Sequence, residues 1–261
     1  MSIETSSADG VTVITLADPD SRNAITGEEM LDDLLDALDE AENDPDVVVV
    51  IFEATGPAFS SGGNVKDMAA REGLFAGSPM EMGEKYRDTI QQLTRFLATT
   101  DLVTIAAVNG PAVGAGFDLV LGCDLRFGSR NARFAHTFIE MGIIPGDGGA
   151  WLLPRVVGWQ RATELALTAR FITAAEAETY GVLLEVVPED RLASRAQEVA
   201  ATIASRPRPA VTLAKRLLRQ ARSMDLDGFL ELSAALQAIA HTTPEHQTAV
   251  ADYVEKLKTR D

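Results

Sequence analysis

The chain has 261 residues and is 46% hydrophobic, which suits one large domain with a sizeable core or a domain with a small appendage. Its 39 acidic and 23 basic residues give a formal charge of −16, so the chain repels nucleic acid and we expect no partner of that kind. It has no apolar run near the roughly 20 residues of a membrane helix, no signal-peptide pattern at its start and only one cysteine, Cys123, so we expect a cytoplasmic protein without disulfides or membrane spans.

The first part of the chain predicts alternating strands and helices. Residues 26–44 form an amphipathic pattern with Thr26 as the expected N-cap, and a second amphipathic helix is expected over 79–100. A further helix should open near Gly114. Strands are predicted at 11–16, 47–54, 103–108, 124–129 and 132–135. The run 47–54 is apolar except for Glu53, as in a strand covered on both faces.

From about residue 159 the pattern is nearly all helical, with a single strand expected at 182–187. The helices are predicted at 159–169, 173–180, 189–205, 209–223, 226–241 and 244–258. The order therefore indicates an α/β protein with strand-helix units in its N-terminal part and helices in its C-terminal part. We place the core with the site at 1–200 and a helical C-terminal region at 201–261.

Two glycine-rich stretches follow buried strands, "FSSGGN" at 59–64 and "NGPAVGAGFD" at 109–118. Neither has the spacing of a dinucleotide fingerprint, and no phosphate-loop Gly-Lys-Ser/Thr follows. Small residues leave the backbone N–H groups of these stretches uncovered by side chains. The N–H groups of Gly63 and Ala115, the second in the first turn of a helix, therefore suit the donors of an oxyanion hole. Asp118 follows Ala115 by about one helical turn. The alternative is a pair of tight turns with ordinary glycines.

Five segments, in order, resemble the crotonase or enoyl-CoA hydratase/isomerase superfamily over essentially the whole chain. They are "RNAIT" at 22–26, the loop segment 44–68, the second loop and its helix at 106–129, the segment 132–158, and the stretch 172–188. The resemblance implies a crotonase-type ββα spiral core with a helical C-terminal trimerisation region. It also implies an acyl-CoA thioester as substrate and a homotrimer or a dimer of trimers.

The resemblance assigns the two oxyanion donors to Gly63 and Ala115, as the residues themselves indicate. Arg22 and Lys66 would meet the phosphates or the adenine end of coenzyme A. The alternative for each residue is a solvated surface charge without a ligand. Asn64 replaces an aspartate that many relatives have. The implied substrate-binding residues are Arg22, Ala24, Ser61, Gly62, Asn64, Val65, Lys66, Val113 and Phe138.

The acid/base positions depart from the family pattern. Hydratases of this family use two glutamates, and these positions hold Asp118 and Phe138. Phenylalanine transfers no proton, so the ordinary two-glutamate hydration mechanism does not apply directly. Asp147, between glycines in "IPGDGG", is the expected second carboxylate in preference to Glu140; alternatively, it caps the helix that starts near Gly149. We expect His136 to be structural.

We therefore expect an enoyl-CoA hydratase or double-bond isomerase. Gly63 and Ala115 would hold the thioester oxygen as an enolate, and Asp118 and Asp147 would share the proton transfers. Two alternatives stay open: a C–C hydrolase of the β-diketone type, and an acyl-CoA binder without catalysis. No metal or separate cofactor is expected, since coenzyme A arrives as part of the substrate.

Overall fold

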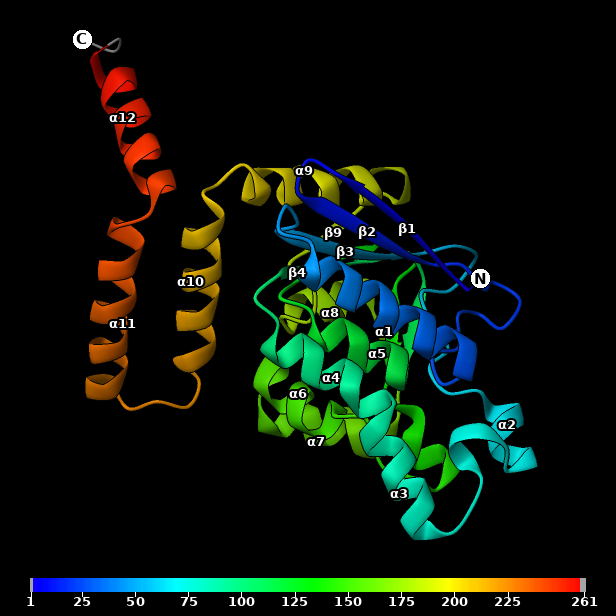
Figure 1. Cartoon of the computed structure of the whole chain (residues 1–261). Helices are drawn as coiled ribbons and strands as arrows, with labels where there is room; N and C mark the ends of the chain where they lie inside the picture. The colour runs from blue at the N-terminus through cyan, green and yellow to red at the C-terminus, as the bar shows by residue number, and fades with distance from the viewer. Residues whose placement is uncertain (1, 259–261) are drawn as a thin grey trace.

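The computed structural model describes residues 2–258, which form two sheets surrounded by helices (Figure 1). The larger sheet has the order β1-β2-β3-β4-β6-β9, and only the pair β1 and β2 is antiparallel. The smaller sheet has the order β5-β7-β8. The strands are β1 (Ile3–Ala8), β2 (Val11–Leu16), β3 (Val49–Ala54), β4 (Val103–Val108), β5 (Pro111–Val113), β6 (Leu125–Ser129), β7 (Arg133–Ala135), β8 (Ile172–Thr173) and β9 (Glu185–Val187).

The chain winds between these two sheets as a spiral. Strand β4 belongs to the large sheet and β5, which follows directly, to the small one; β6 and β7 repeat this step. Isolated bridges from Ser60 to Ala112 and from Ala24 to Gly62 continue the arrangement into the loop after β3. This winding of the chain is the ββα spiral that the resemblance predicts for the core.

Helices cover the large sheet on both faces. The α-helices are α1 (Glu28–Asn43), α2 (Val65–Ala70), α3 (Pro79–Asp88), α4 (Ile90–Thr99), α5 (Ala115–Gly122), α6 (Gly149–Val157), α7 (Trp159–Thr168), α8 (Ala174–Thr179), α9 (Leu192–Ala204), α10 (Arg208–Gln220), α11 (Leu226–His241) and α12 (Pro244–Lys258). Three short 3-10 helices are η1 (Gly73–Phe75), η2 (Thr137–Met141) and η3 (Glu189–Arg191).

The structure corrects three of the expected elements. Gly27, not Thr26, caps helix α1, because the Thr26 hydroxyl accepts a hydrogen bond from the Asn64 amide instead. The helix expected over 79–100 is two helices, broken at Thr89, whose φ of −123° and ψ of −99° are not helical. The strand expected over 182–187 is shorter, since β9 begins at Glu185.

Strand β1 lies outside the elements that the sequence predicts. Only Ile3 of its six residues is buried, so its sequence carries no apolar alternation. A two-residue turn, Asp9 and Gly10, joins it to β2 with φ values of 51° and 79°. Positive φ at both positions is typical of a hairpin turn whose twist matches the two strands.

The large sheet separates two apolar cores, and β3 contributes to both. Val50 and Phe52 pack with α1, α4 and α5, whereas Val49 and Ile51 face α9. Alternate residues of a strand point to opposite faces, so a strand between two layers needs an unbroken apolar run. The run at 47–54 is therefore confirmed as a strand covered on both faces.

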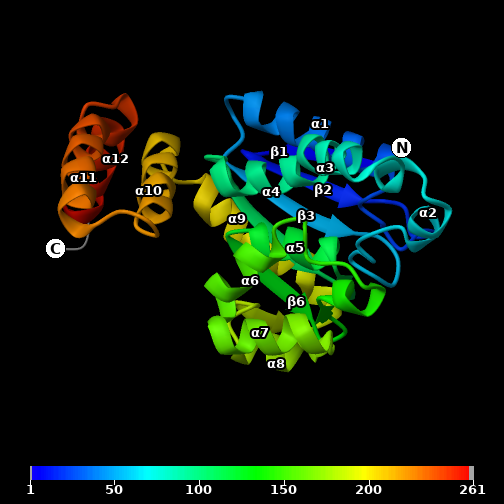
Figure 2. The ribbon, with the colours of Figure 1, turned by 90° about the horizontal axis from the view of Figure 1, so that it is seen from below.

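Helices α10, α11 and α12 extend away from the two sheets, as both views of the ribbon show (Figures 1 and 2). Basic residues of α10 hold this arm to the body: the Lys215 ammonium lies 2.7 Å from Asp124, and Arg216 pairs with Asp101. The boundary at residue 200 stays a prediction; α9, which ends at Ala204, packs against the sheet. None of the helices within residues 2–258 is long and apolar enough to cross a bilayer.

Candidate active site

The two glycine-rich loops pack directly against each other. A Cβ on Gly62 would lie 2.3 Å from the Val113 carbonyl oxygen and 2.9 Å from the Ala115 nitrogen. A Cβ on Gly116 would lie 2.6 Å from the Ser60 side chain. Any side chain at either glycine would therefore push the loops apart, so the glycines permit a contact between two backbones.

The predicted donors, the N–H groups of Gly63 and Ala115, lie on either side of this contact. Gly63 follows Gly62, which takes a φ of 80° that suits glycine. Ala115 is the first residue of α5, and its N–H is one of the four at a helix start that have no partner within the helix. The positive end of the helix dipole is at the same place. The arrangement suits an anionic oxygen.

The other predicted residues of the first loop surround Gly62. Ala24 is buried and bridges to Gly62, and Ser61 donates to the Ser21 carbonyl at 3.1 Å. The Asn64 side chain accepts from the Lys66 amide and caps α2. Three side chains are exposed at the rim of this loop, namely Arg22, Val65 and Lys66. Their contact with coenzyme A stays a prediction.

Asp118 is buried and forms hydrogen bonds with two groups from different parts of the chain. Its Oδ1 lies 2.6 Å from Nε2 of His136, and its Oδ2 accepts the Gly149 N–H at 3.0 Å. Both side chains of the pair are almost completely buried, with 2% of Asp118 and 1% of His136 exposed. The pair therefore fixes the position of Asp118.

Asp147 is buried in the turn before α6, and only 5% of it is exposed. Burial, and secondly the negative charge of Asp118, raise the pKa of Asp147 to about 7. It does not cap the following helix, because no side chain caps α6 and Asp118 accepts the Gly149 N–H instead. The site thus holds two carboxyl groups in different surroundings, and such pairs often divide into an acid and a base.

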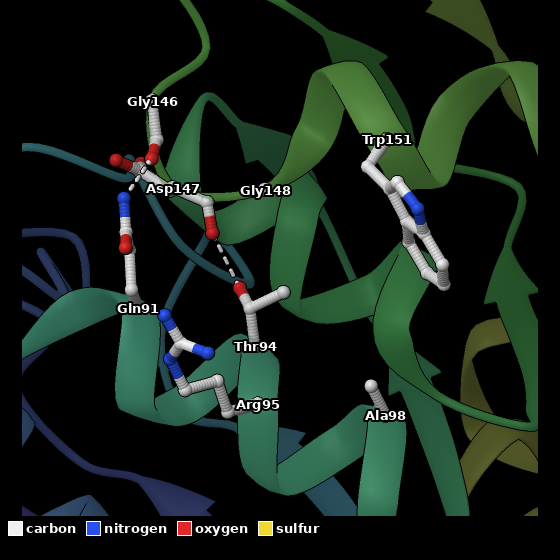
Figure 3. A pocket seen from close by; sticks show the side chains of 8 residues that line it. All are labelled: Gln91, Thr94, Arg95, Ala98, Gly146, Asp147, Gly148 and Trp151. Atoms are coloured by element: carbon white, nitrogen blue, oxygen red, sulfur yellow. Dashed lines mark hydrogen bonds between the residues drawn. The ribbon is translucent and has the colours of Figure 1, made fainter. Parts of the chain in front are cut away.

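A cavity of about 300 Å³ lies between Asp147 and helix α4. Gln91 and Thr94 reach across from α4 and donate to the carbonyls of Gly146 and Asp147, which anchors the turn, while Trp151 stands on the far side (Figure 3). The lining residues are Gln91, Thr94, Arg95, Ala98, Gly146, Asp147, Gly148 and Trp151. A second cavity of about 680 Å³ shares Gln91 and Gly146 and is lined also by Tyr86, Ile143 and Ile144.

Phe138, at the predicted position of the second glutamate, is 6% exposed and covers the second loop. A Cβ on Gly114 would lie 3.6 Å from the tip of its ring. The ring also meets His136 edge to face, with centroids 5.5 Å apart. Glu140, the weaker candidate for a second carboxylate, is exposed and lies outside this cluster.

The structure thus brings the two loops together through Gly62, and the two carboxylates together through the start of α6. Helix α5 links them, since it carries Ala115 at its start and Asp118 one turn later. His136 and Gly149 are the residues that the sequence did not assign to the site. Only the position of His136, two residues before Phe138, hinted at its place.

Comparisons with known proteins identify the family of the chain. The family model described as enoyl-CoA hydratase/isomerase matches residues 6–260. The chain is 32% identical over 247 residues to the 1,2-epoxyphenylacetyl-CoA isomerase of Escherichia coli, covering 95% of this chain and 93% of that protein. It is 31% identical over 249 residues to the short-chain-enoyl-CoA hydratase of Clostridium acetobutylicum, covering 95% and 92%. An enoyl-CoA hydratase structure from Bacillus anthracis superposes with a TM-score of 0.90 at 30% identity and covers 98% of this chain and 97% of that one.

Proposed function

The chain belongs to the enoyl-CoA hydratase/isomerase family, and on this premise we propose that it shifts the double bond of an enoyl-CoA thioester by proton transfer between two aspartates. The observation that carries the proposal is the unequal pair in the site. Asp118 forms hydrogen bonds with His136 and with the Gly149 N–H, whereas burial raises the pKa of Asp147 to about 7. One carboxylate and one carboxylic acid are what such a transfer requires.

The thioester oxygen binds to the N–H groups of Gly63 and Ala115 in this proposal. Asp118 removes a proton from the carbon next to the thioester carbonyl, and the electron pair moves onto the thioester oxygen as an enolate. Asp147 then donates its proton to the far carbon of the former double bond while the enolate electrons form the new one. Asp118 ends protonated and Asp147 ionised, and one proton exchange resets the pair. Each oxyanion donor supplies about 3–4 kcal/mol in acyl-transfer enzymes.

Hydration is the second candidate, favoured by relatives such as the Clostridium acetobutylicum hydratase. Adding water needs a base for the water and an acid for the carbon, and the two aspartates supply both. Phe138, however, puts an apolar ring where a second glutamate would hold the water. We therefore propose that isomerisation is faster than hydration. The β-diketone hydrolase and the binder without catalysis stay predictions that the same experiment tests.

Coenzyme A would extend from the first loop past Arg22 and Lys66, whose exposed cations suit its phosphates. Assembly as a homotrimer or a dimer of trimers is supported by exposed apolar side chains on the C-terminal arm, namely Leu218, Leu226, Leu230, Ile239, Val250, Tyr253, Val254 and Leu257. Apolar side chains that gather on a surface mark interfaces. A cytoplasmic location fits the buried free thiol of Cys123.

The test is a panel of purified thioesters with the wild type, Asp118→Asn and Asp147→Asn. The panel contains a 3-enoyl-CoA, a 2-enoyl-CoA and a saturated acyl-CoA, with a β-diketone as the substrate for C–C cleavage. We expect conversion of the 3-enoyl-CoA with a bell-shaped pH profile, and a loss of about 10²-fold or more in each variant. Cleavage of the β-diketone alone, or binding of the thioesters without conversion, would overturn the proposal. Light scattering of the purified chain measures its oligomeric state.

A further inference from the structure

His136 is a buried titratable side chain that takes no part in the proposed proton transfers. Only 1% of it is exposed, and its Nε2 lies 2.6 Å from Oδ1 of Asp118. Its other ring nitrogen, Nδ1, is also buried and has no hydrogen-bond partner among the described residues. The two nitrogens therefore have different surroundings: Nε2 lies against a carboxyl oxygen, and Nδ1 is buried without a hydrogen-bond partner.

Two aromatic side chains fix the plane of the imidazole. Phe117 meets the ring nearly edge to face at 5.2 Å between centroids, and Phe138 meets it at 5.5 Å. The ring is thus packed in one orientation, with Nε2 directed at Asp118. The Asp118 carboxylate is fixed as well, because its second oxygen accepts the Gly149 N–H. Neither partner of the pair can turn away without disturbing this packing.

The unpartnered Nδ1 decides which nitrogen of His136 carries the proton. An imidazolium would bury an N–H with no acceptor at Nδ1, and a charge-bearing donor is the more costly group to leave unpaired. A neutral ring with its proton on Nδ1 would set the Nε2 lone pair against a carboxylate oxygen. The remaining form is neutral and has its proton on Nε2, where it is donated to Asp118. The pair then keeps a single negative charge on Asp118.

We propose that His136 is a positioning residue that, as a neutral Nε2–H donor, holds Asp118 ionised and aimed as the proton acceptor, and thereby sets which aspartate is the base and which the acid. The direction of proton transfer in this inference rests on the proposed function, but the protonation of the ring does not. Three further titratable groups lie near the pair of Asp118 and His136. Asp147 lies in the turn before α6, and Arg95 of α4 lines the same cavity as Asp147. Tyr86 of α3 has its pKa raised by burial and by the charge of Asp147.

Two variants separate donation from packing. His136→Gln keeps an amide N–H at the distance of Nε2 from the backbone, whereas His136→Phe keeps a ring of similar shape and removes the donor. Without the donor, protonation of Asp118 becomes easier. We therefore expect the acidic limb of the kcat profile of His136→Phe to move to higher pH by about one unit or more, and kcat at its optimum to fall about 10- to 100-fold. His136→Gln should keep the acidic limb of the wild type.

The pH profile of kcat in these variants separates the two explanations. A uniform loss at every pH in both variants, with unmoved limbs, would show that His136 only packs and would overturn the inference. The basic limb, which reports Asp147, should stay near pH 7 in both variants. Because KM reports binding of coenzyme A at another part of the site, it should change little.

The protonation of the ring is tested without any substrate. The chain has three histidines, so ¹⁵N-histidine labelling of the full-length protein gives few ring signals, and the signals missing from His136→Gln identify His136. We expect a protonated Nε2 and an unprotonated Nδ1 from pH 5.5 to 8.5. An imidazolium, or a proton on Nδ1, in this range would overturn the inference even if the variants are inactive. The expected ring form in a protein that converts no thioester would contradict only the proposed function.

Discussion

The backbone N–H of Gly149 donates to Oδ2 of Asp118 at 3.0 Å, and this bond joins the start of helix α6 to helix α5. A Cβ on Gly149 would lie 2.2 Å from Oδ1 and 2.5 Å from Oδ2 of the same carboxylate. The carboxylate therefore occupies the space that any other residue would need for its side chain. A helix start carries a partial positive charge, so this position also stabilises an ionised Asp118.

Replacing Gly149 by Ala should displace the Asp118 carboxylate, because its two oxygens would overlap the new methyl group. A misplacement of about 1 Å in a reacting group costs on the order of 10²-fold in rate, and we expect a fall in kcat of that size. Steady-state kinetics on the converted thioester measures it.

The matched control is Gly83→Ala in α3, where the new Cβ would meet only the tip of Arg87 at 3.8 Å. This variant should keep the wild-type kcat and gain a few tenths to about 1 kcal/mol in unfolding free energy, because alanine favours a helix. Wild-type turnover in folded Gly149→Ala would show that Asp118 tolerates displacement.

Ala115→Pro should remove one oxyanion donor and leave α5 intact. Proline suits the first position of a helix, where its missing N–H has no partner within the helix in any case. We expect kcat to fall about 10²- to 10³-fold, the usual cost of one such donor. The control is Ala115→Gly, which keeps the N–H and should retain most of the activity. Equal kinetics of the two variants, with equal circular dichroism, would exclude Ala115 as a donor.

Asp147→Asn should stabilise the protein at pH 8. The pKa of Asp147 is raised from 3.8 to about 7 in the folded state, so between about pH 4 and pH 7 the unfolded chain binds fewer protons. The free energy of unfolding contributed by this group therefore falls as the pH rises through that window and is level above it. Asparagine does not titrate, and the variant should avoid a loss on the order of 4 kcal/mol.

Urea unfolding at pH 4, 6 and 8 measures this difference, which should widen with pH. Glu140→Gln is the control, because Glu140 is exposed and its replacement should leave the pH dependence unchanged. Parallel curves for Asp147→Asn and the wild type would mean that Asp147 ionises as easily in the folded state as in the unfolded chain.

Phe138→Glu should raise the rate of hydration relative to isomerisation. The ring covers Gly114 at the second loop, and a glutamate there would place a proton-transferring group at the position where the family resemblance predicts one. The ratio of the two rates on matched 2-enoyl and 3-enoyl thioesters is the readout, and we expect it to rise about 10-fold or more. Phe138→Leu, which adds no carboxylate, serves as the control and should leave the ratio unchanged.

The sequence by itself determined the elements whose pattern is local. The run at 47–54, apolar except for Glu53, predicted a strand buried on both faces, and Val49 and Val50 do face different cores. The glycine-rich stretches predicted bare backbone, because glycine is the residue that allows close approach. The resemblance of five segments, in order along the chain, identified the family correctly.

Pattern alone misjudged elements that depend on neighbours elsewhere in the chain. Strand β1 has one buried residue in six and exists because it pairs with β2 through the turn at Asp9 and Gly10. Thr26 was expected to cap α1, but its hydroxyl binds the Asn64 amide, 38 positions away. A hydrogen bond of this separation leaves no trace in local spacing.

Only the tertiary structure decided which residues form hydrogen bonds with the candidate catalytic carboxyl groups. His136 is separated from Asp118 by 18 positions and Gly149 by 31, yet both form hydrogen bonds with its carboxyl group. The sequence named Asp118 and Asp147, but not that Asp118 hydrogen-bonds with His136 and Gly149 while burial raises the pKa of Asp147. These contacts and this burial come from elements far apart in the chain, which the fold brings together through packing and which no spacing along the chain encodes.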